Sequence, residues 1–299
     1  MSLPDADADE RAQHERAPSQ SRWLAASNAY GITSVAKNLA PLLALYTAAP
    51  YVADRSLAVA FGFAPLIGLL LYRLTMVMHD CGHGTLFTWR GANERVGKLL
   101  GFVTGVDFGC FKQAHWQHHK IYGQPGDPQG FHYLGLSRMT RTAYAWHVVK
   151  PLVGANLRYV FRESIVHPRN LAAAAANGQL AVLVVVQLGL ALLITGLWRH
   201  PSLVLLPFVS AATFGLFLSQ LRGIAEHGVG EQGKPETQVR SHAPELLGRT
   251  LLYDVHFNFH EEHHRYPGVP SHHLPELARE LSPGKLPRSI WQTLRRRAR

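Results

Sequence analysis

Histidine is the residue whose number and spacing point to chemistry in this chain. There are 18 histidines among 299 residues, and eight of them fall into the three short motifs HDCGH, HWQHH and HEEHH. These eight are His79, His83, His115, His118, His119, His260, His263 and His264. Residues three and four positions apart share one face of a helix, so each motif can direct two or three imidazoles to one point. Neutral imidazole is a ligand for zinc, iron, copper and nickel.

Composition alone does not explain the motifs. At this histidine content, an HxxxH pair is expected roughly once by chance, so HDCGH is weak evidence by itself. Two HxxHH triplets are expected only on the order of 0.002 times. The two triplets therefore do not arise from composition alone, and they indicate a metal site.

The number of imidazoles predicts two metal ions. His227, in the sequence RGIAEHG, is a ninth candidate, with an ordinary polar residue at a helix end as the alternative. Eight or nine nitrogens exceed the roughly four ligands of one zinc ion, so we expect two metals with four or five ligands each. Iron is favoured, with O2 as co-substrate, because zinc has no redox chemistry; copper stays open.

Polar side chains beside the motifs could accept a hydrogen bond from the second ring N–H of the ligating histidines. Residues around metal sites usually orient their histidine ligands in this way. The candidates are Asp80, Glu226, His256, Glu261 and Glu262. His256, four residues before His260, could instead share that helix face and bind the metal itself. A carboxylate that only faces solvent would look the same in the sequence.

Four apolar tracts must position the motifs, at residues 39–53, 57–78, 171–197 and 203–221. Each is close to the roughly 20 residues that an α-helix needs to cross a bilayer, although the first is short and contains Pro50. We therefore expect an all-α, polytopic membrane protein with about four transmembrane helices. A cytoplasmic helical cap would carry the dimetal site.

Basic residues are placed as in a membrane protein, although the net charge of +10 could suggest nucleic acid. Residues 79–170 hold eleven Lys and Arg and residues 222–299 hold twelve, whereas the two short connections hold only Arg55 and Arg199. The positive-inside rule then places both termini and the active site on the cytoplasmic side of a multi-pass inner membrane. No nucleic-acid partner is expected.

The expected domains are a disordered polar tail (1–33), a membrane domain (34–283) and a basic tail (284–299). The last either lies on anionic headgroups or is solvated.

The three motifs, in this order and between paired apolar tracts, resemble the histidine boxes of the membrane fatty acid desaturase superfamily. That superfamily also contains alkane and carotenoid hydroxylases and carotenoid ketolases. The resemblance implies that the box histidines bind two irons and that His227, near the end of the fourth span, completes the set. The segments Asp127-Pro128 and Tyr266–Pro270 are also similar to the family.

The resemblance implies a fatty-acyl or similar lipid substrate and an external electron source. We expect no fused cytochrome b5-like domain and therefore a separate donor: ferredoxin, rubredoxin, or a cytochrome b5-like protein with its reductase. Family frequencies favour desaturation over hydroxylation or ketolation of a hydrocarbon or terpenoid.

Two other classes remain as alternatives. HEEHH also satisfies HExxH, with His260, Glu261 and His264, which would describe an intramembrane zinc metalloprotease using the glutamate as general base. It would leave the other motifs without a purpose. A metal transporter would carry ionisable ligands inside its spans, where this chain has almost none apart from Arg73.

Overall fold

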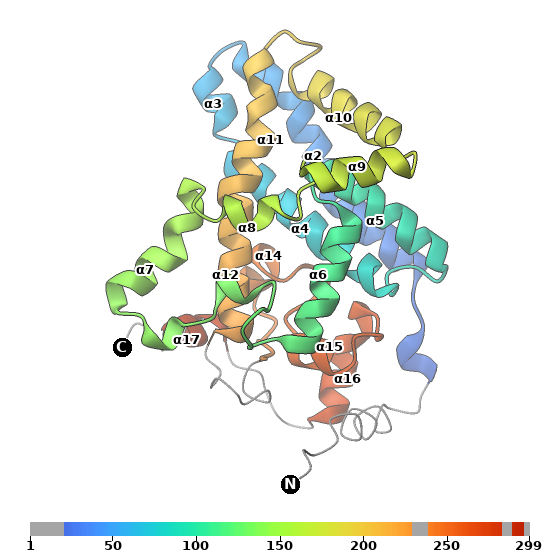
Figure 1. The fold of residues 1–299 in the computed structure, drawn as a ribbon, viewed down its shortest axis with the longest axis vertical. Coiled ribbons are helices and arrows are strands. Elements are labelled where there is room, and N and C mark those ends of the chain that lie inside the picture. The colour runs from blue at the N-terminus through green and yellow to red at the C-terminus, as the bar shows by residue number, and fades with distance from the viewer. Residues whose placement is uncertain (1–20, 229–238, 283–288, 296–299) are drawn as a thin grey trace.

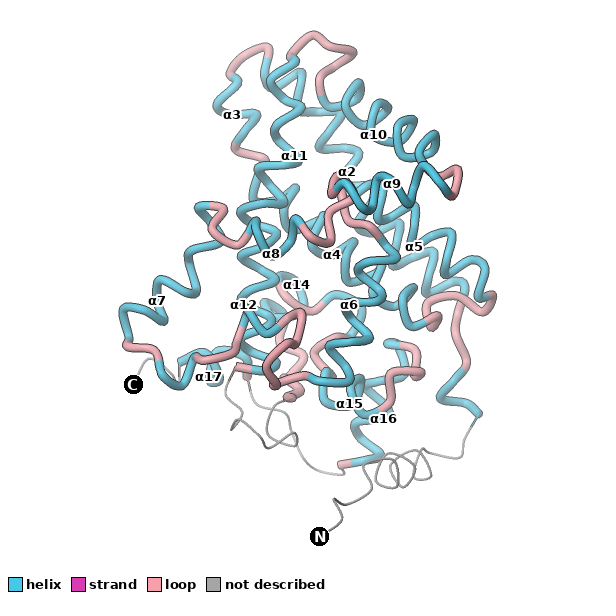
Figure 2. Tube along the Cα trace, viewed as in Figure 1, coloured by secondary structure: helices cyan, strands magenta, loops and turns pink. Residues whose placement is uncertain are grey.

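The computed structural model describes residues 21–228, 239–282 and 289–295. Within these ranges the regular secondary structure is helical, and the β-structure is limited to isolated bridges such as the one between Val106 and Ser164. Figure 2 shows these helices joined by loops and turns. The expected all-α class is confirmed.

Two long stretches, Leu57–His83 and Pro201–His227, are each 27 residues of helix and apolar enough to cross a membrane. The first consists of α3 (Leu57–Phe61) and α4 (Ala64–His83). The second consists of a 3-10 turn, α11 (Leu205–Ser210), a π-helical turn over Ala211–Gly215, and α12 (Leu216–His227). Both match apolar tracts of the sequence, as expected of a membrane protein.

The third tract does not form one straight helix. Its residues lie in α9 (Pro168–Ala176) and α10 (Leu180–Ile194), which meet at 117° and could make one broken span or a re-entrant loop. Gly178 between them has a φ of +67°, a left-handed conformation that glycine adopts readily and that ends a helix. The tract over residues 171–197, expected to be one helical span, is therefore divided between two helices.

The first tract belongs to α2 (Asn28–Ala53), which is 26 residues long and starts where the Ser27 side chain accepts a hydrogen bond from the Tyr30 amide. This helix is not among those that are both long and apolar enough, because Lys37 and Asn38 lie in its first half. The described residues thus contain two or three candidate spans, rather than the four expected.

Parts of the expected tails fall within the described residues. Ser21–Leu24 form a 3-10 turn and α2 begins at Asn28, both inside the stretch expected as a polar tail. Residues 1–20 lie outside the described ranges. Near the other end, Ile290–Arg295 form α17, and the rest of 284–299 is described only at Ser289.

The core centres on α4, which packs against α2, α5 (Arg90–Thr104) and the π-helical turn. At Gly68 a Cβ atom would lie 2.6 Å from the carbonyl oxygen of Ser210, so only glycine permits this close approach of α4 to the fourth tract. Leu42, Tyr46 and Leu74 are at most 1% exposed within this core. The result is a rigid support for the end of α4.

The segments that carry the second and third histidine motifs and His227 lie at one end of the molecule. The lower part of α6 (Phe108–Ile121), α15 (His260–Arg265), α16 (Leu274–Leu281) and the end of α12 gather there, while α3 and the connection from α10 to α11 lie at the opposite end (Figure 1). Between α6 and α9 the chain forms α7 (Arg141–Val149) and α8 (Leu157–Phe161). A shorter helix, α14 (Leu246–Leu251), precedes the third motif.

A buried carboxylate ties this end to the core. Asp254, 3% exposed, accepts hydrogen bonds from Asn38 of α2 at 2.6 Å and Arg73 of α4 at 3.0 Å. Lys37 also pairs with it. Val255 and His256, which follow directly, have φ values of +49° and +62°, a conformation that costs free energy in residues with a Cβ. The ion pairs thus hold the strained turn that leads to the third motif.

Candidate metal centre

All nine candidate histidines gather in two neighbouring groups. The first group consists of His79, His83, His115, His119 and His263, and the second of His118, His227, His260 and His264. In each group the possible ligand atoms lie within 4.8 Å of one another. Residues up to 185 positions apart in the sequence are thereby brought to one place, as the sequence predicted.

The groups do not follow the motifs. On α6, His115 and His119 face the first group and His118 faces the second; on α15, His263 faces the first and His260 and His264 face the second. Helical geometry explains the split, because positions i and i+4 are more closely aligned around the helix axis than positions i and i+3. Two helices therefore serve both groups, while α4 serves only the first and α12 only the second.

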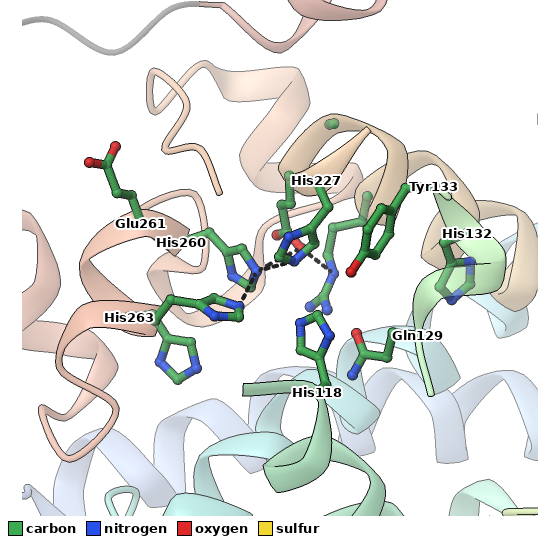
Figure 3. A network of polar contacts seen from close by, with 12 residues as sticks. His118, Gln129, His132, Tyr133, His227, His260, Glu261 and His263 are labelled. Atoms are coloured by element: carbon green, nitrogen blue, oxygen red, sulfur yellow. Dashed lines mark hydrogen bonds and ion pairs between the residues drawn. The ribbon is translucent and has the colours of Figure 1, made fainter. Parts of the chain in front are cut away.

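Ring nitrogens within each group are closely spaced. In the first group the Nε2 atom of His115 lies 3.0 Å from that of His83 and 2.9 Å from that of His119. In the second group the Nε2 atom of His260 lies 3.0 Å from that of His227 and 3.1 Å from that of His264. Figure 3 shows His118, His227 and His260 directed toward one another. Ligands about 2.1 Å from one metal would be spaced about 3.0 to 3.4 Å apart.

The donor atoms fit metal ions. Several buried ring nitrogens, including Nε2 of His118 and both nitrogens of His79, have no hydrogen-bond partner among the described residues. Burial lowers the pKa of His119 to about 2 and places the pKa values of His260, His263 and His264 well below their usual value, with neighbouring imidazoles adding to the effect. The imidazoles are thus neutral, which is the form that binds metal.

A segment after α6 orients two of these histidines. Asp127 Oδ1 lies 2.9 Å from Nδ1 of His118, which leaves Nε2 directed into the second group. The Nε2 amide nitrogen of Gln129 lies 3.1 Å from Nδ1 of His115 in the first group. Tyr133 donates a short hydrogen bond to Asp127, and the backbone amide of Gly123 donates to the Tyr133 hydroxyl at 2.9 Å. His118 is therefore held with its proton on Nδ1. For His115 to bind a metal through Nε2, the Gln129 amide must present its oxygen to Nδ1–H, which is the flipped orientation of the same side chain.

The electrostatics of Asp127 suit this role. Burial alone would raise its pKa, but hydrogen bonds from His118, Tyr133 and the Gln129 amide lower the pKa below its ordinary value. The carboxylate is therefore ionised and fixes the proton of His118 on Nδ1.

The same segment is anchored to α12 by buried polar groups. Gln220 Oε1 lies 3.0 Å from Nδ1 of His132 and accepts a hydrogen bond from the Asn156 amide at 2.9 Å. The Gln220 amide in turn donates to the His132 carbonyl oxygen at 2.8 Å. A Cβ at Gly223, one turn further along α12, would lie 2.7 Å from Cβ of His132. These contacts fix the orienting segment against the helix that carries His227.

Some of the residues expected to orient the histidines lie beside them, and others do not. Asp80 Oδ1 lies 3.6 Å from Nδ1 of His79 and Glu226 Oε2 lies 3.4 Å from Nε2 of His260. Glu262 accepts a hydrogen bond from Ser241. His256 is outside both groups and stacks on Tyr30, with ring centroids 6.5 Å apart.

Glu261 does not occupy the place of a protease base. It is exposed on α15, with its carboxylate directed away from His260 (Figure 3). A general base must reach a water molecule on the metal. The HExxH interpretation therefore lacks its catalytic carboxylate.

The sequence did not single out Gln129, Tyr133 or Gln220, and it marked Asp127 only as part of a segment similar to the family. Gln129 and Tyr133 follow the Asp127-Pro128 pair in the sequence, which was the available signal. Their roles depend on the fold of a loop, which carries no periodicity.

Comparison with known proteins defines the class. The family described as "Fatty acid desaturase" matches residues 56–294, so the chain belongs to the fatty acid desaturase family and the resemblance is confirmed. The chain is 28% identical to the human sphingolipid delta(4)-desaturase/C4-monooxygenase DES2 over 76% of its own length and 65% of that protein. It is 26% identical to the mouse sphingolipid delta(4)-desaturase DES1, over 71% and 62% respectively. The chain thus matches slightly less than two thirds of the length of these relatives.

Proposed function

We propose that this chain is a membrane-bound non-haem di-iron oxidoreductase that uses O2 and external electrons to desaturate a lipid hydrocarbon chain. The observation that carries the proposal is the pair of neighbouring groups of five and four imidazoles. One structural zinc ion takes about four ligands in a closed site, so two groups of this size favour two metals. Hydroxylation is the second outcome for the same site, because a relative is named both a desaturase and a C4-monooxygenase.

The overall reaction balances with two external electrons. In desaturation, O2, two electrons, two protons and a –CH2–CH2– unit give a –CH=CH– unit and two water molecules. In hydroxylation the same inputs and one C–H bond give an alcohol and one water molecule. When bound, the irons would supply an oxidant able to attack an unactivated C–H bond.

The residues of the chain hold and shield this chemistry. Asp127 and Gln129 fix the ring orientations of His118 and His115, one in each group. His118, His227 and His260 are each at most 2% exposed, so the second group is largely closed to water. Exclusion of water protects reactive species from side reactions.

The arrangement in the membrane follows from the apolar helices and the charges. We infer four crossings, made by α2, Leu57–His83, the bent pair α9 and α10, and Pro201–His227. The concentration of Lys and Arg in residues 79–170 and 222–299 supports a cytoplasmic location for the histidine end. A lipid chain would then reach the metals from the bilayer, with its headgroup near the cytoplasmic surface.

The substrate we propose is the hydrocarbon chain of a membrane lipid. A sphingolipid long chain is the first to assay, since the curated relatives act on sphingolipids by name. Fatty-acyl lipids are the second class to assay.

Expression in a host with known lipids tests the proposal. Mass spectrometry should detect a lipid that has lost two hydrogen atoms, or gained one oxygen atom, only with O2 and a reductant. His118→Ala should abolish the product. His200→Ala is the matched control, because His200 lies outside both groups, in the connection from α10 to α11 and 2.8 Å from Asp54. Unchanged lipids in every host lipid class, from protein that carries iron, would contradict the proposed activity.

A further inference from the structure

An exposed tryptophan separates the first histidine group from the protein surface. Trp116 lies on α6 with 38% of its surface exposed. Its ring centroid is 4.9 Å from that of His83 and 5.8 Å from that of His119. One indole side chain therefore touches two candidate ligands and also reaches the outside.

The exposure of the first group is concentrated at this point. His79, His115 and His263 are at most 4% exposed, whereas His83 and His119 are half-buried. These two are the residues that Trp116 contacts. An electron that reached the indole would be one ring contact away from the proposed metal ligands.

Two lysines flank Trp116 along α6. Lys112 and Lys120 lie four residues before and after Trp116, so all three side chains share one face of α6. Lys120 is exposed and the Lys112 side chain is 42% exposed, with Glu94 of α5 3.4 Å from its ammonium group. No Asp or Glu occurs within α6 itself. This patch (Lys112, Trp116 and Lys120) has the charge that attracts an acidic protein.

We propose that the patch formed by Lys112, Trp116 and Lys120 is the docking site of a small acidic one-electron carrier protein, and that electrons enter the first group through Trp116. The inference rests on the proposed di-iron function. The carrier is oxidised by one electron at each docking, and two dockings supply the two electrons of one turnover. The indole provides the path and keeps its own redox state.

The size of the patch suits such a partner. Electron-transfer complexes are weak and bury little surface, because the carrier must leave after each electron. Two lysines around one aromatic ring provide steering by charge and a short path, without a large apolar interface. A headgroup anchor is the other use of an exposed tryptophan, and the experiment separates the two.

Stopped-flow reduction of the purified, iron-loaded full-length protein tests the proposal. The probe is reduced plant-type ferredoxin with a two-iron, two-sulfur cluster, whose absorbance reports its oxidation. Lys112→Glu combined with Lys120→Glu should lower the second-order rate constant at least about tenfold at low salt and weaken its salt dependence. Trp116→Leu should lower the limiting rate at saturating ferredoxin severalfold. Reduction by dithionite should stay unchanged in both variants.

Matched controls lie on other surfaces. Trp89→Leu removes a tryptophan that is 56% exposed and packs against Arg95 rather than a histidine. Arg158→Glu with Arg162→Glu reverses two exposed charges four residues apart near α8. Both controls should be reduced by ferredoxin at the wild-type rate.

A second measurement does not depend on iron. Ferredoxin should bind the metal-free protein, and the double lysine variant should weaken that binding while Trp89→Leu does not. Wild-type rates and binding in both patch variants would overturn the proposal. Two results together would also overturn it: quenching of Trp116 fluorescence by brominated lipids in the wild type, and normal reduction of the Trp116→Leu variant by ferredoxin. Trp116 would then be a membrane anchor. A wild-type protein that takes up no iron would instead contradict the proposed function.

Discussion

The Nδ1 atom of His118 lies 2.9 Å from a carboxylate oxygen of Asp127, which stands nine residues further along the chain. Both side chains are fully buried. This pair fixes which nitrogen of His118 faces the second histidine group. It also connects a loop with no regular periodicity to the centre of the proposed chemistry.

Asp127→Asn should therefore weaken one of two metal sites. The amide can still accept a hydrogen bond but carries no charge, so we expect the affinity for Fe(II) to fall about 10- to 100-fold at the second group. Titration of metal-free protein against a chelator should show one weakened and one normal site. The control is Asp54→Asn, at a 42% exposed carboxylate paired with Arg199. Two unchanged sites in Asp127→Asn would refute the orienting role.

Asp254→Asn should destabilise the fold. Burial would raise the pKa of Asp254, but Lys37 and Arg73 lower it, so the folded protein contains an ionised carboxylate. Removing its charge leaves Arg73 without its buried partner, at a cost of up to about 3 kcal/mol. We expect the melting temperature in detergent to drop by about 5 °C or more.

The same Asp54→Asn variant separates a buried from an exposed ion pair. Loss of the exposed pair between Asp54 and Arg199 should lower the free energy of unfolding by at most about 1 kcal/mol, because exposed ion pairs contribute little to stability. Equal losses of stability in the two variants would show that Asp254 does not hold the strained turn at Val255 and His256.

Glu261→Gln should leave turnover within about twofold of the wild type, since the carboxylate is exposed and directed away from His260. In a zinc protease of the HExxH class, loss of the general base would abolish activity. Product formation by the purified Glu261→Gln protein decides between the di-iron oxidoreductase and the zinc protease. A loss of turnover by several orders of magnitude would restore the protease interpretation.

The raised pKa of Glu163 should make the stability of the fold depend on pH. Burial raises its pKa from 4.5 to about 7, more than Arg162, 3.7 Å away, lowers it. Between pH 4.5 and 7 the folded protein keeps a proton on Glu163 that the unfolded chain releases. The free energy of unfolding therefore falls as the pH rises through this range, and the loss is complete above pH 7.

Glu163→Gln should accordingly raise the melting temperature at pH 8 and have little effect at pH 5. Glu94→Gln, at an exposed carboxylate beside Lys98 and Lys112, is the control and should not raise it. The same shift at both pH values in Glu163→Gln would contradict the raised pKa.

The sequence identified the histidines because their spacing on helices is a local property. HxxHH places three imidazoles on adjoining faces whatever the rest of the fold does. The division of His115 and His118 between two groups was not visible, since it depends on how α6 and α15 pack. Gln129 and Tyr133 lie in a loop whose conformation no periodicity reports.

The membrane helices were less predictable. Hydropathy identified the apolar tracts, but residues 171–197 bend at Gly178 and α2 begins within the stretch expected to be a polar tail. Hydropathy measures how apolar a window is, and it does not register a left-handed glycine or an N-cap such as Ser27.

Metal analysis of the purified protein tests the central claim most directly. Elemental mass spectrometry together with Mössbauer spectroscopy should find close to two irons per chain in the wild type. His118→Ala should lose iron mainly from the second group, while His200→Ala keeps both irons. A single zinc ion per chain, with no iron after anaerobic reconstitution, would contradict the di-iron account.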